Sequence, residues 1–524
     1  MIFEMMSKIE TITYSTLFLK IVCPSFIKMA VRLVMDSLTQ EQITSIRKAL
    51  YFQPETPGFA RKKKFHTVAK DPILFYSIDK PLGHIILPYT FANSLFKCHL
   101  NSNRQYLPIK YSFTGSLRDY QVPVYDKCME HLTTKGTTIL GAYPSFGKTI
   151  LSACMAATLG GLTLIVYPLT TLESGWNTTF SEKTNASIWI NNPVTNKEPF
   201  DITKHQVILT MDTQYHKISP EILSHVKILV IDECHMFCTP GRINCLLGAN
   251  PLYVIACTAT LERADKMESL IHAVCGTHGV FLKNPKPFNV YKIMTGISVE
   301  VEQNKQGDPD WSKLVKKYCE SERRNRMILD IIRNNISSKF MILTWNKKHA
   351  YYLSELCIKN GITSDVMAGN KKKYNDSQVL VGTAQKIGTA FDEQLSCPDW
   401  SGIRSNILML VGSTKSLSGL HQFCGRVYRS EFPVIIDFVD NNSICKRHWT
   451  ERKKYYLDPD TKGTIHDVDY SKFTHQENPG NSDSANGAIT VPDLEDEKQL
   501  KSVTGNMASK IRAKLMIVSP TSKP

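Results

Sequence analysis

Short, continuously apolar runs separated by helix-forming stretches are the feature that most constrains how this chain folds. A strand buried on both faces of a parallel sheet reads as an unbroken run of Val, Ile and Leu, and each crossover needs a long connection, usually a helix. One series of such runs comprises residues 137–140, 162–168, 206–210, 226–232 and 252–258, and a second comprises 340–345, 378–383, 406–412 and 434–440. The alternation predicts two tandem α/β domains, each a parallel sheet with helices on both faces.

Changes in composition divide the 524 residues, which are too many for one compact core, into four segments. We expect a small α+β accessory domain over 1–112, the two α/β domains over 113–300 and 301–465, and a tail over 466–524. The polar stretch 304–311 is the candidate linker between the two α/β domains. The tail is rich in Asn, Ser, Gly, Asp and Lys and poor in aromatic residues, which predicts that most of it is disordered.

The N-terminal segment has its own local signals. The stretch SLTQEQITSIRKALYF predicts a helix, and Thr39 with Gln42 predicts a capping box at its start. The run HIILPYTF is strand-like. The basic run RKKK, residues 61–64, is most often a solvated loop in such a setting, with nucleic-acid contact as the alternative.

The net charge of the chain indicates what kind of molecule the protein binds. Lys and Arg total 63 against 48 Asp and Glu, which gives a formal net charge of +15. This excess favours a polyanion, nucleic acid first and a membrane surface second, over a basic surface without a partner. No apolar stretch reaches the roughly 20 residues of a membrane span, and no Cys-x-x-Cys pair occurs. We therefore expect an intracellular, cytoplasmic protein with reduced thiols that does not enter a membrane.

The segment AYPSFGKT matches the pattern [AG]-x-x-x-x-G-K-[ST] of a phosphate-binding loop. It follows a predicted strand and precedes a helix-forming stretch, which is the context that the motif requires. In such a loop Gly147 lets the backbone approach phosphate, Lys148 meets the β- and γ-phosphates, and Thr149 offers its hydroxyl to Mg²⁺. The predicted ATP site also includes Ala142, Tyr143, Pro144, Ser145 and Phe146. Phe146 replaces a small residue and is expected to pack beneath the loop.

In the run ILVIDECHMF, four apolar residues are followed directly by two acids, Asp232 and Glu233. A strand that serves only to pack the core is not expected to carry two acids, because burying an unpaired carboxylate costs on the order of several kcal/mol or more. Beside a phosphate loop, the first acid can hold the water shell of Mg²⁺ and the second can accept a proton from the attacking water. The pair therefore indicates hydrolysis of Mg-ATP.

In that position DECH resembles the D-E-x-H box of superfamily two helicases, and further motifs follow in the family's order. LRDYQ resembles the Gln motif, which implies that Gln121 reads adenine. VYPLTTL (166–172) and LTMDTQ (209–214) resemble the strand-tracking motifs, and CTAT (257–260) resembles the motif that couples hydrolysis to movement. The resemblance implies coupling roles for His235, Thr258 and Thr260.

The second series carries the other half of this resemblance. VLVGTAQKIGTAFD resembles the fifth motif, in which Gly388 and Asp392 face nucleotide and strand. HQFCGRVYRS matches Q-x-x-G-R-x-x-R, which implies that Arg426 and Arg429 reach the γ-phosphate and that Gln422 lies beside the attacking water. Arginine suits that role because its planar guanidinium stays charged and binds phosphate bidentately. The resemblance covers roughly residues 117–440 and implies a pair of RecA-like domains.

Within the superfamily, the forms GRVYR, QKIGTAFD and LRDYQ are most similar to the transcript-release DNA helicases of poxviruses. This implies a monomeric 3′→5′ DNA motor that uses ATP and Mg²⁺ in viral transcription elongation and transcript release. The transcription machinery would be a partner and the virion a further location. An RNA helicase and a translocase on double-stranded DNA remain alternatives. A non-catalytic binding subunit is a remote one, because a scaffold has no need of Lys148, Asp232, Glu233, Arg426 and Arg429.

Several other residues allow two readings. Trp176, Trp189 and Trp345 could stack on bases, although a Trp in an α/β domain more often fills the core. The basic runs 371–373 and 446–454 fit either a groove that follows a nucleic-acid backbone or solvated faces.

Overall fold

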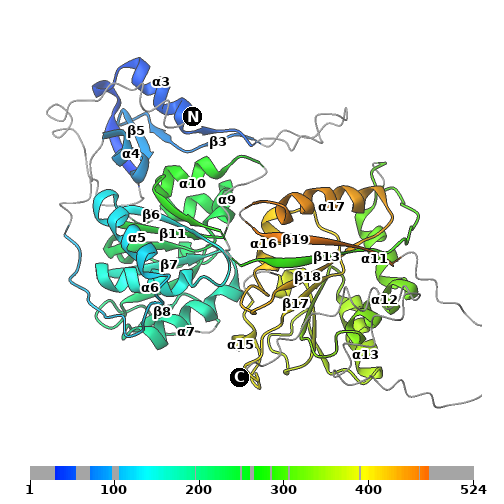
Figure 1. Cartoon of the computed structure of the whole chain (residues 1–524). Helices are drawn as coiled ribbons and strands as arrows, with labels where there is room; N and C mark the ends of the chain where they lie inside the picture. The colour runs from blue at the N-terminus through cyan, green and yellow to red at the C-terminus, as the bar shows by residue number, and fades with distance from the viewer. Residues whose placement is uncertain are drawn as a thin grey trace, which may run out of the picture. The chain divides into compact units, whose positions relative to one another are not determined.

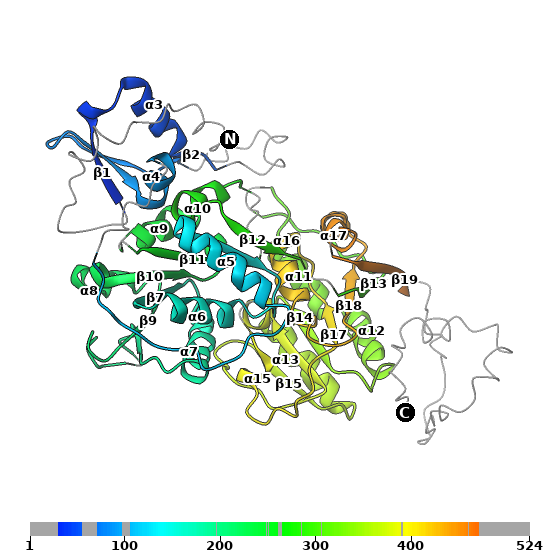
Figure 2. The same cartoon turned by 60° about the vertical axis from the view of Figure 1, so that its left-hand side comes forward.

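The computed structural model of the chain describes residues 30–54, 71–96, 105–194, 196–247, 249, 251–259, 265–283, 286–304, 307–388, 391–459 and 461–470. The chain divides into two compact units, Met1–Asn284 and Pro285–Pro524. Each is built on one seven-stranded sheet in which every pair of neighbouring strands is parallel. Helices cover the sheets (Figures 1 and 2). Two parallel α/β sheets were predicted, and that fold class is confirmed.

The first sheet has the strand order β12-β6-β11-β10-β7-β9-β8. Its strands are β6 (Thr137–Ala142), β7 (Leu162–Tyr167), β8 (Ile188–Ile190), β9 (Val207–Met211), β10 (Val226–Ile231), β11 (Tyr253–Thr258) and β12 (Gly279–Leu282). Every residue of β6 and β7 is buried, which is why these strands consist of apolar residues and threonine, without charged residues. The five runs predicted for this domain are all strands.

The two faces of this sheet bury different side chains. Along β6, Ile139 belongs to one apolar core and Leu140 to the other, as the period of two residues in a strand requires. The helices of this sheet are α5 (Val122–Lys135), α6 (Lys148–Leu159), α7 (Glu173–Lys183), α8 (Pro220–His225), α9 (Pro240–Ile243) and α10 (Glu268–Cys275). Residues of α5, α6 and α7 pack on the face of Leu140, and residues of α8 and α10 pack on the face of Ile139.

The N-terminal segment adds a small antiparallel sheet to the first unit. Its order is β1-β5-β4, and β2 and β3 form a separate pair. The elements are β1 (Ala30–Val34), α3 (Gln40–Ala49), β2 (Tyr51–Phe52), β3 (Ile73–Leu74), β4 (Ser77–Asp79), β5 (His84–Pro88) and α4 (Tyr89–Phe96). The capping box is confirmed: Thr39 Oγ1 accepts from the Gln42 N–H, and Gln42 Oε1 accepts from the Thr39 N–H. The basic run 61–64 lies outside the described residues.

The second sheet has the order β15-β16-β14-β17-β18-β13-β19. Its strands are β13 (Phe288–Met294), β14 (Phe340–Thr344), β15 (Ser364–Met367), β16 (Val379–Thr383), β17 (Ile407–Leu410), β18 (Val434–Val439) and β19 (Gly463–Asp469). The helices are α11 (Trp311–Glu320), α12 (Glu322–Arg333), α13 (Lys347–Lys359), α14 (Ala384–Ile387), α15 (Glu393–Ser396), α16 (Leu417–Cys424) and α17 (Ser443–Tyr456). The four apolar runs predicted for this domain are all strands.

The boundaries differ from those expected. β13 pairs with β18 and β19, so it belongs to the second sheet, although the sequence placed it in the domain ending at residue 300. Because β13 mixes buried with more exposed residues, it lacks the apolar continuity of the predicted strands β14, β16, β17 and β18. The stretch 304–311 is not the linker, since Gln303 bridges Pro309 within the second unit and Asp310 caps α11. The tail begins later than residue 466, because β19 continues to Asp469.

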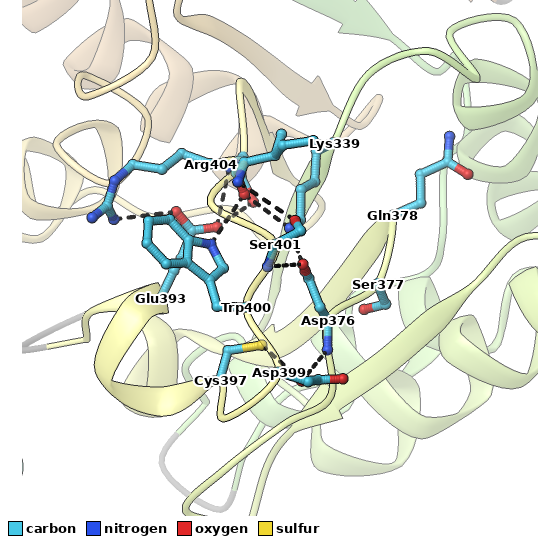
Figure 3. A network of polar contacts seen from close by, with 12 residues as sticks. Lys339, Asp376, Ser377, Gln378, Glu393, Cys397, Asp399, Trp400, Ser401 and Arg404 are labelled. Carbon is cyan, nitrogen blue, oxygen red and sulfur yellow. Dashed lines mark hydrogen bonds and ion pairs between the residues drawn. The ribbon is translucent and has the colours of Figure 1, made fainter.

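Polar contacts join the loops at the amino ends of β14, β16 and β17 (Figure 3). Lys339 forms an ion pair with Asp376 and donates to Ile403 O at 2.9 Å. The Ser401 N–H also donates to Asp376, at 2.8 Å. The buried Glu393 accepts from Ser405 Oγ at 2.7 Å. These contacts join the loops to one another, and the bond from Ser405 satisfies a buried carboxylate oxygen.

Two expectations concern the chain as a whole. No described helix is both long and apolar enough to cross a membrane. Every cysteine that the structure describes is a free thiol.

The buried side chain of His349 makes the stability of the second unit depend on pH. Its ring lies between Thr344 Oγ1 and Asn325 Oδ1, at 2.9 Å from each. Burial, with the charge of Arg324, lowers the pKa of His349 to about 3. The folded unit therefore keeps this ring neutral while the unfolded chain takes up a proton below about pH 6.5. Stability present above that pH is lost as the pH falls, by about 1.4 kcal/mol per pH unit once the unfolded histidine is protonated.

We expect His349→Gln to reduce this acid dependence of the second unit. The measurement is urea unfolding between pH 7 and pH 4, compared as the slope of unfolding free energy against pH. His216→Gln, at an exposed position in the first unit, is the control and should leave the slope unchanged. Equal slopes in His349→Gln and the unsubstituted protein would contradict the expectation.

Candidate nucleotide-binding site

The phosphate-loop segment connects β6 to α6. The first N–H groups of α6 have no acceptor within the helix, and the positive end of its dipole lies there. Gly147 has a φ of +101°, and a Cβ atom at this residue would lie 2.4 Å from Gln121 Nε2. Only glycine takes this position without strain. The turn therefore forms a cradle of backbone N–H groups suited to an anion.

Gln121 supports this turn from below. It is buried, its Nε2 donates to Phe146 O at 2.9 Å, and its Oε1 accepts from the Arg118 N–H at 2.9 Å. Both ends of the amide are thus bonded to backbone, one of them in the loop. Its contact with adenine stays a prediction, and the structure adds a second role as a support of the loop.

Phe146 packs beneath the loop, as expected. It is 3% exposed and lies between the rings of Tyr120 and Tyr143, with centroids 5.5 and 5.4 Å away. The aromatic residue stabilises the loop by burial in place of the glycines found in many such loops.

The two acids follow the end of β10. The Asp232 N–H donates to Val166 O at 2.9 Å, which continues the pairing of β10 with β7. The carboxylate is almost fully buried: one oxygen accepts from Trp176 Nε1 at 2.7 Å and the other from the Glu233 N–H at 2.9 Å. Burial raises the pKa of Asp232 to about 6, and the charge of Glu233 adds to the rise. The charge of Lys148 opposes it, so the two groups interact.

Lys148 and Thr149 open α6 beside this carboxylate. Lys148 Nζ donates to Ala142 O at 2.8 Å, so the ammonium bends back over its own loop. The ammonium and the loop N–H groups are suited to bind the phosphates of a nucleotide. The nearby buried acid is suited to the metal ion that accompanies them.

His235 joins the acidic box to the next strand. Its Nδ1 lies 2.9 Å from Thr258 Oγ1 at the end of β11 and 3.3 Å from Glu233 Oε2. His235 thus contacts a threonine of the motif at 257–260, and its coupling role stays a prediction. Glu233 has a φ of +48°, a conformation that few residues other than glycine adopt. Thr260 lies outside the described residues.

The predicted residues of the second unit also cluster. Arg426 donates to Phe391 O at 2.5 Å and to Gly388 O at 3.1 Å. Arg429 forms an ion pair with Asp392, and this pairing lowers the pKa of that carboxyl despite its burial. Gln422 lies in the preceding helix α16 and is buried. Both guanidinium groups are thus held by the segment that resembles the fifth motif.

The candidate residues belong to two different units. Lys148, Asp232 and Glu233 lie in the first unit, and Arg426 and Arg429 lie in the second. Their meeting at one nucleotide stays a prediction.

The alternative readings of the tryptophans and basic runs are partly decided. Trp176 is 1% exposed, so it is a core residue and does not stack on bases, whereas Trp345 is 39% exposed. Trp189 donates to Glu198 O at 2.8 Å. In the run 446–454, Trp449 and Arg452 are buried, so a continuous basic and aromatic groove is wrong there. The sequence missed Trp176 as a site residue, and no local signal marks its bond to an acid 56 residues away.

Mg²⁺ fits the first unit by the chemistry of its donors. Asp232 and Thr149 supply carboxylate and hydroxyl oxygens, which this ion prefers. Among the residues that the structure describes, no group of three or more His, Cys, Asp or Glu is arranged to hold a metal. Mg²⁺ bound with a nucleotide usually keeps several waters and takes its other ligands from the phosphates.

Comparison with known proteins adds an independent finding. Residues 114–263 match the family model "Type III restriction enzyme, res subunit". The chain is 25% identical to the predicted helicase 161L of Invertebrate iridescent virus 6, over 71% of this chain and 87% of that one. It is also 25% identical to the predicted helicase 055L of Frog virus 3 (isolate Goorha), over 65% of this chain and 78% of that one.

A solved structure is also similar. S. cerevisiae Dbp5 bound to RNA and ADP BeF3 aligns over 66% of this chain and 89% of that one, with 14% identity and a TM-score of 0.45. The chain is thus similar to two viral proteins that are described as helicases, and the segment that matches the family model lies in the first unit and contains the phosphate loop and the two acids.

Proposed function

We propose that this protein is an ATP-dependent DNA helicase or translocase that moves 3′→5′ and acts in viral transcription elongation and transcript release. The observation that carries the proposal is the grouping in the first unit. The loop lysine lies within electrostatic reach of the buried Asp232, and His235 joins the following acid to Thr258. The transcription role rests on the resemblance to the poxvirus helicases.

In this proposal the loop N–H groups and Lys148 bind the phosphates of ATP, while Thr149 and Asp232 would hold Mg²⁺. The ion, when bound, neutralises phosphate charge and orients the γ-phosphate. Glu233 accepts the proton of the attacking water, and Gln422 positions that water. His235 and Thr258 carry the change in the site into β11.

The second unit supplies the closing step. Arg426 and Arg429 leave their bonds to Gly388, Phe391 and Asp392 and reach the γ-phosphate when the two units close. Because those same bonds hold the fifth-motif segment, their exchange would link nucleotide binding to a segment expected to contact the strand. Hydrolysis removes the γ-phosphate, and the arginines return.

The domain limits are part of the proposal. We assign the first RecA-like domain to residues 113–284 and the second to 285–470, with the N-terminal segment as an accessory domain. The motor is proposed to act as a monomer, and the net charge of +15 supports contacts to the nucleic-acid backbone that do not depend on sequence.

The deciding experiment measures ATP hydrolysis with single-stranded DNA and with RNA of equal length. We expect DNA to give the larger stimulation, and unwinding of a partial duplex only when the overhang is 3′. Stronger stimulation by RNA would favour an RNA helicase. Triplex displacement without strand separation would favour a double-stranded DNA translocase, and no turnover with any nucleic acid would favour a binding subunit.

A further inference from the structure

The indole of Trp176 makes a contact that core packing alone does not require. It lies in the first turns of α7, it is 1% exposed, and its Nε1 donates to Asp232 at 2.7 Å. A buried indole N–H needs some acceptor, and a backbone carbonyl would satisfy it equally well. Here the acceptor is the one carboxylate that is proposed to hold Mg²⁺. A hydrogen bond to a charged acceptor is about twice as strong as one between neutral groups.

This bond sets the direction of the carboxylate. One Asp232 oxygen accepts from Trp176 and the other accepts from the Glu233 N–H. Each carboxylate oxygen can accept two hydrogen bonds. The two donors therefore occupy one position on each oxygen and fix the direction of the remaining lone pairs. Rotation of the carboxylate would break a buried hydrogen bond to a charged group, and the energetic cost of that loss opposes the rotation.

The same helix is attached to the strand before it. Tyr167, the last residue of β7, donates through its hydroxyl to Glu173 Oε2 at 2.8 Å. Glu173 begins α7, and Trp176 lies one turn later. The short segment 168–172 between β7 and α7 belongs to the stretch that resembles a strand-tracking motif. A shift of that segment would therefore move α7 and, through the indole, the carboxylate of Asp232.

We propose that Trp176 is a positioning residue that holds the Asp232 carboxylate in its Mg²⁺-binding orientation and links it to the segment 168–172. The inference rests on the proposed function and deepens it, because it names the connection between the strand-tracking segment and the metal ligand. It lies wholly within the first unit.

The test compares three variants of the full chain. Trp176→Phe keeps an aromatic ring in the core and removes the N–H donor. Trp176→His restores a donor, because its Nε2 lies two ring atoms from Cγ as the indole Nε1 does. Trp189→Phe is the matched control, since Trp189 is in the same unit and donates to the backbone carbonyl oxygen of Glu198 instead of to a carboxylate. Thermal unfolding establishes that each variant is folded.

The first readout is the Mg²⁺ dependence of nucleic-acid-stimulated ATP hydrolysis. We expect Trp176→Phe to raise the Mg²⁺ concentration for half-maximal activity roughly tenfold, the usual size for loss of a partner of a metal ligand. At saturating Mg²⁺ the KM for ATP should change little. Trp176→His should recover part of the loss, and Trp189→Phe should match the unsubstituted protein. A general loss of folding would instead lower activity at every Mg²⁺ concentration.

The second readout is tryptophan emission and does not require turnover. Adding Mg²⁺ and ADP, or a single-stranded oligonucleotide alone, should change the emission of the unsubstituted protein and of Trp189→Phe. Trp176→Phe should lose this change. If the unsubstituted protein hydrolyses no ATP, the proposed function fails, and the emission titration still tests the role of Trp176.

Two results would overturn the inference. One is an unchanged Mg²⁺ requirement in a folded Trp176→Phe, and the other is an emission response that persists in that variant. If Trp176→Phe does not fold, the Trp176→His variant tests the inference. A Mg²⁺ requirement like that of the unsubstituted protein supports the inference, and a tenfold higher Mg²⁺ requirement contradicts it.

Discussion

Lys148→Ala should abolish nucleic-acid-stimulated ATP hydrolysis and leave the first unit folded. With nucleotide bound, the ammonium would stabilise the charge that develops on the transferred phosphoryl group, and loss of one such contact costs about 10²–10³-fold in turnover. In the structure Lys148 Nζ donates to Ala142 O, and loss of that hydrogen bond costs the folded state about 1 kcal/mol. The measurement is steady-state ATPase activity with saturating single-stranded DNA, beside thermal unfolding.

A surface lysine of the same unit supplies the control for Lys148. Lys127 pairs with Glu130 on the exposed face of α5, so Lys127→Ala should keep full activity. Lys148→Arg keeps the charge but changes its geometry, and it should also be strongly impaired. Full activity in a folded Lys148→Ala protein would refute the assignment of the phosphate loop.

Arg452→Leu should destabilise the second unit by about 3–5 kcal/mol, the cost of leaving a buried charge without its partner. Arg452 is fully buried and bonds Asp437 through two nitrogens, at 2.7 and 2.8 Å. It also donates to Thr414 O at 2.8 Å, just before α16, the helix that carries Gln422. Urea unfolding followed by circular dichroism measures the effect, and only the transition of the second unit should move.

Two comparisons sharpen this result. Lys453→Ala changes the next residue of α17, which is exposed, and should alter stability by less than about 0.5 kcal/mol. Arg452→Leu combined with Asp437→Leu removes both charges and should regain much of the loss, because an apolar pair avoids the desolvation cost. A single variant as stable as Lys453→Ala would show that the pair does not hold this unit together.

The strands of both sheets were predictable because burial on two faces leaves a local mark. β10 and β18 are mainly apolar runs in the sequence, and all of their residues except Lys227 are buried in the structure. β13 and β19 carry no such mark, since β13 mixes buried with more exposed residues and Val468 is the one buried residue of β19. Assigning these two strands to the second sheet required knowledge of their partners in that sheet. For this reason the expected boundary at 300 placed β13 in the first domain, and the boundary at 465 divided β19.

The sequence by itself determined the fold class and the chemical types at the site, because hydrophobic period and loop spacing are properties of neighbouring residues. Tertiary structure alone decided which partner each side chain meets. Gln121 supports the loop backbone, Arg452 neutralises a buried acid, and the indole of Trp176 orients Asp232 from 56 residues away. Such contacts depend on how helices pack on strands, and pairing between distant residues leaves no periodic trace along one chain.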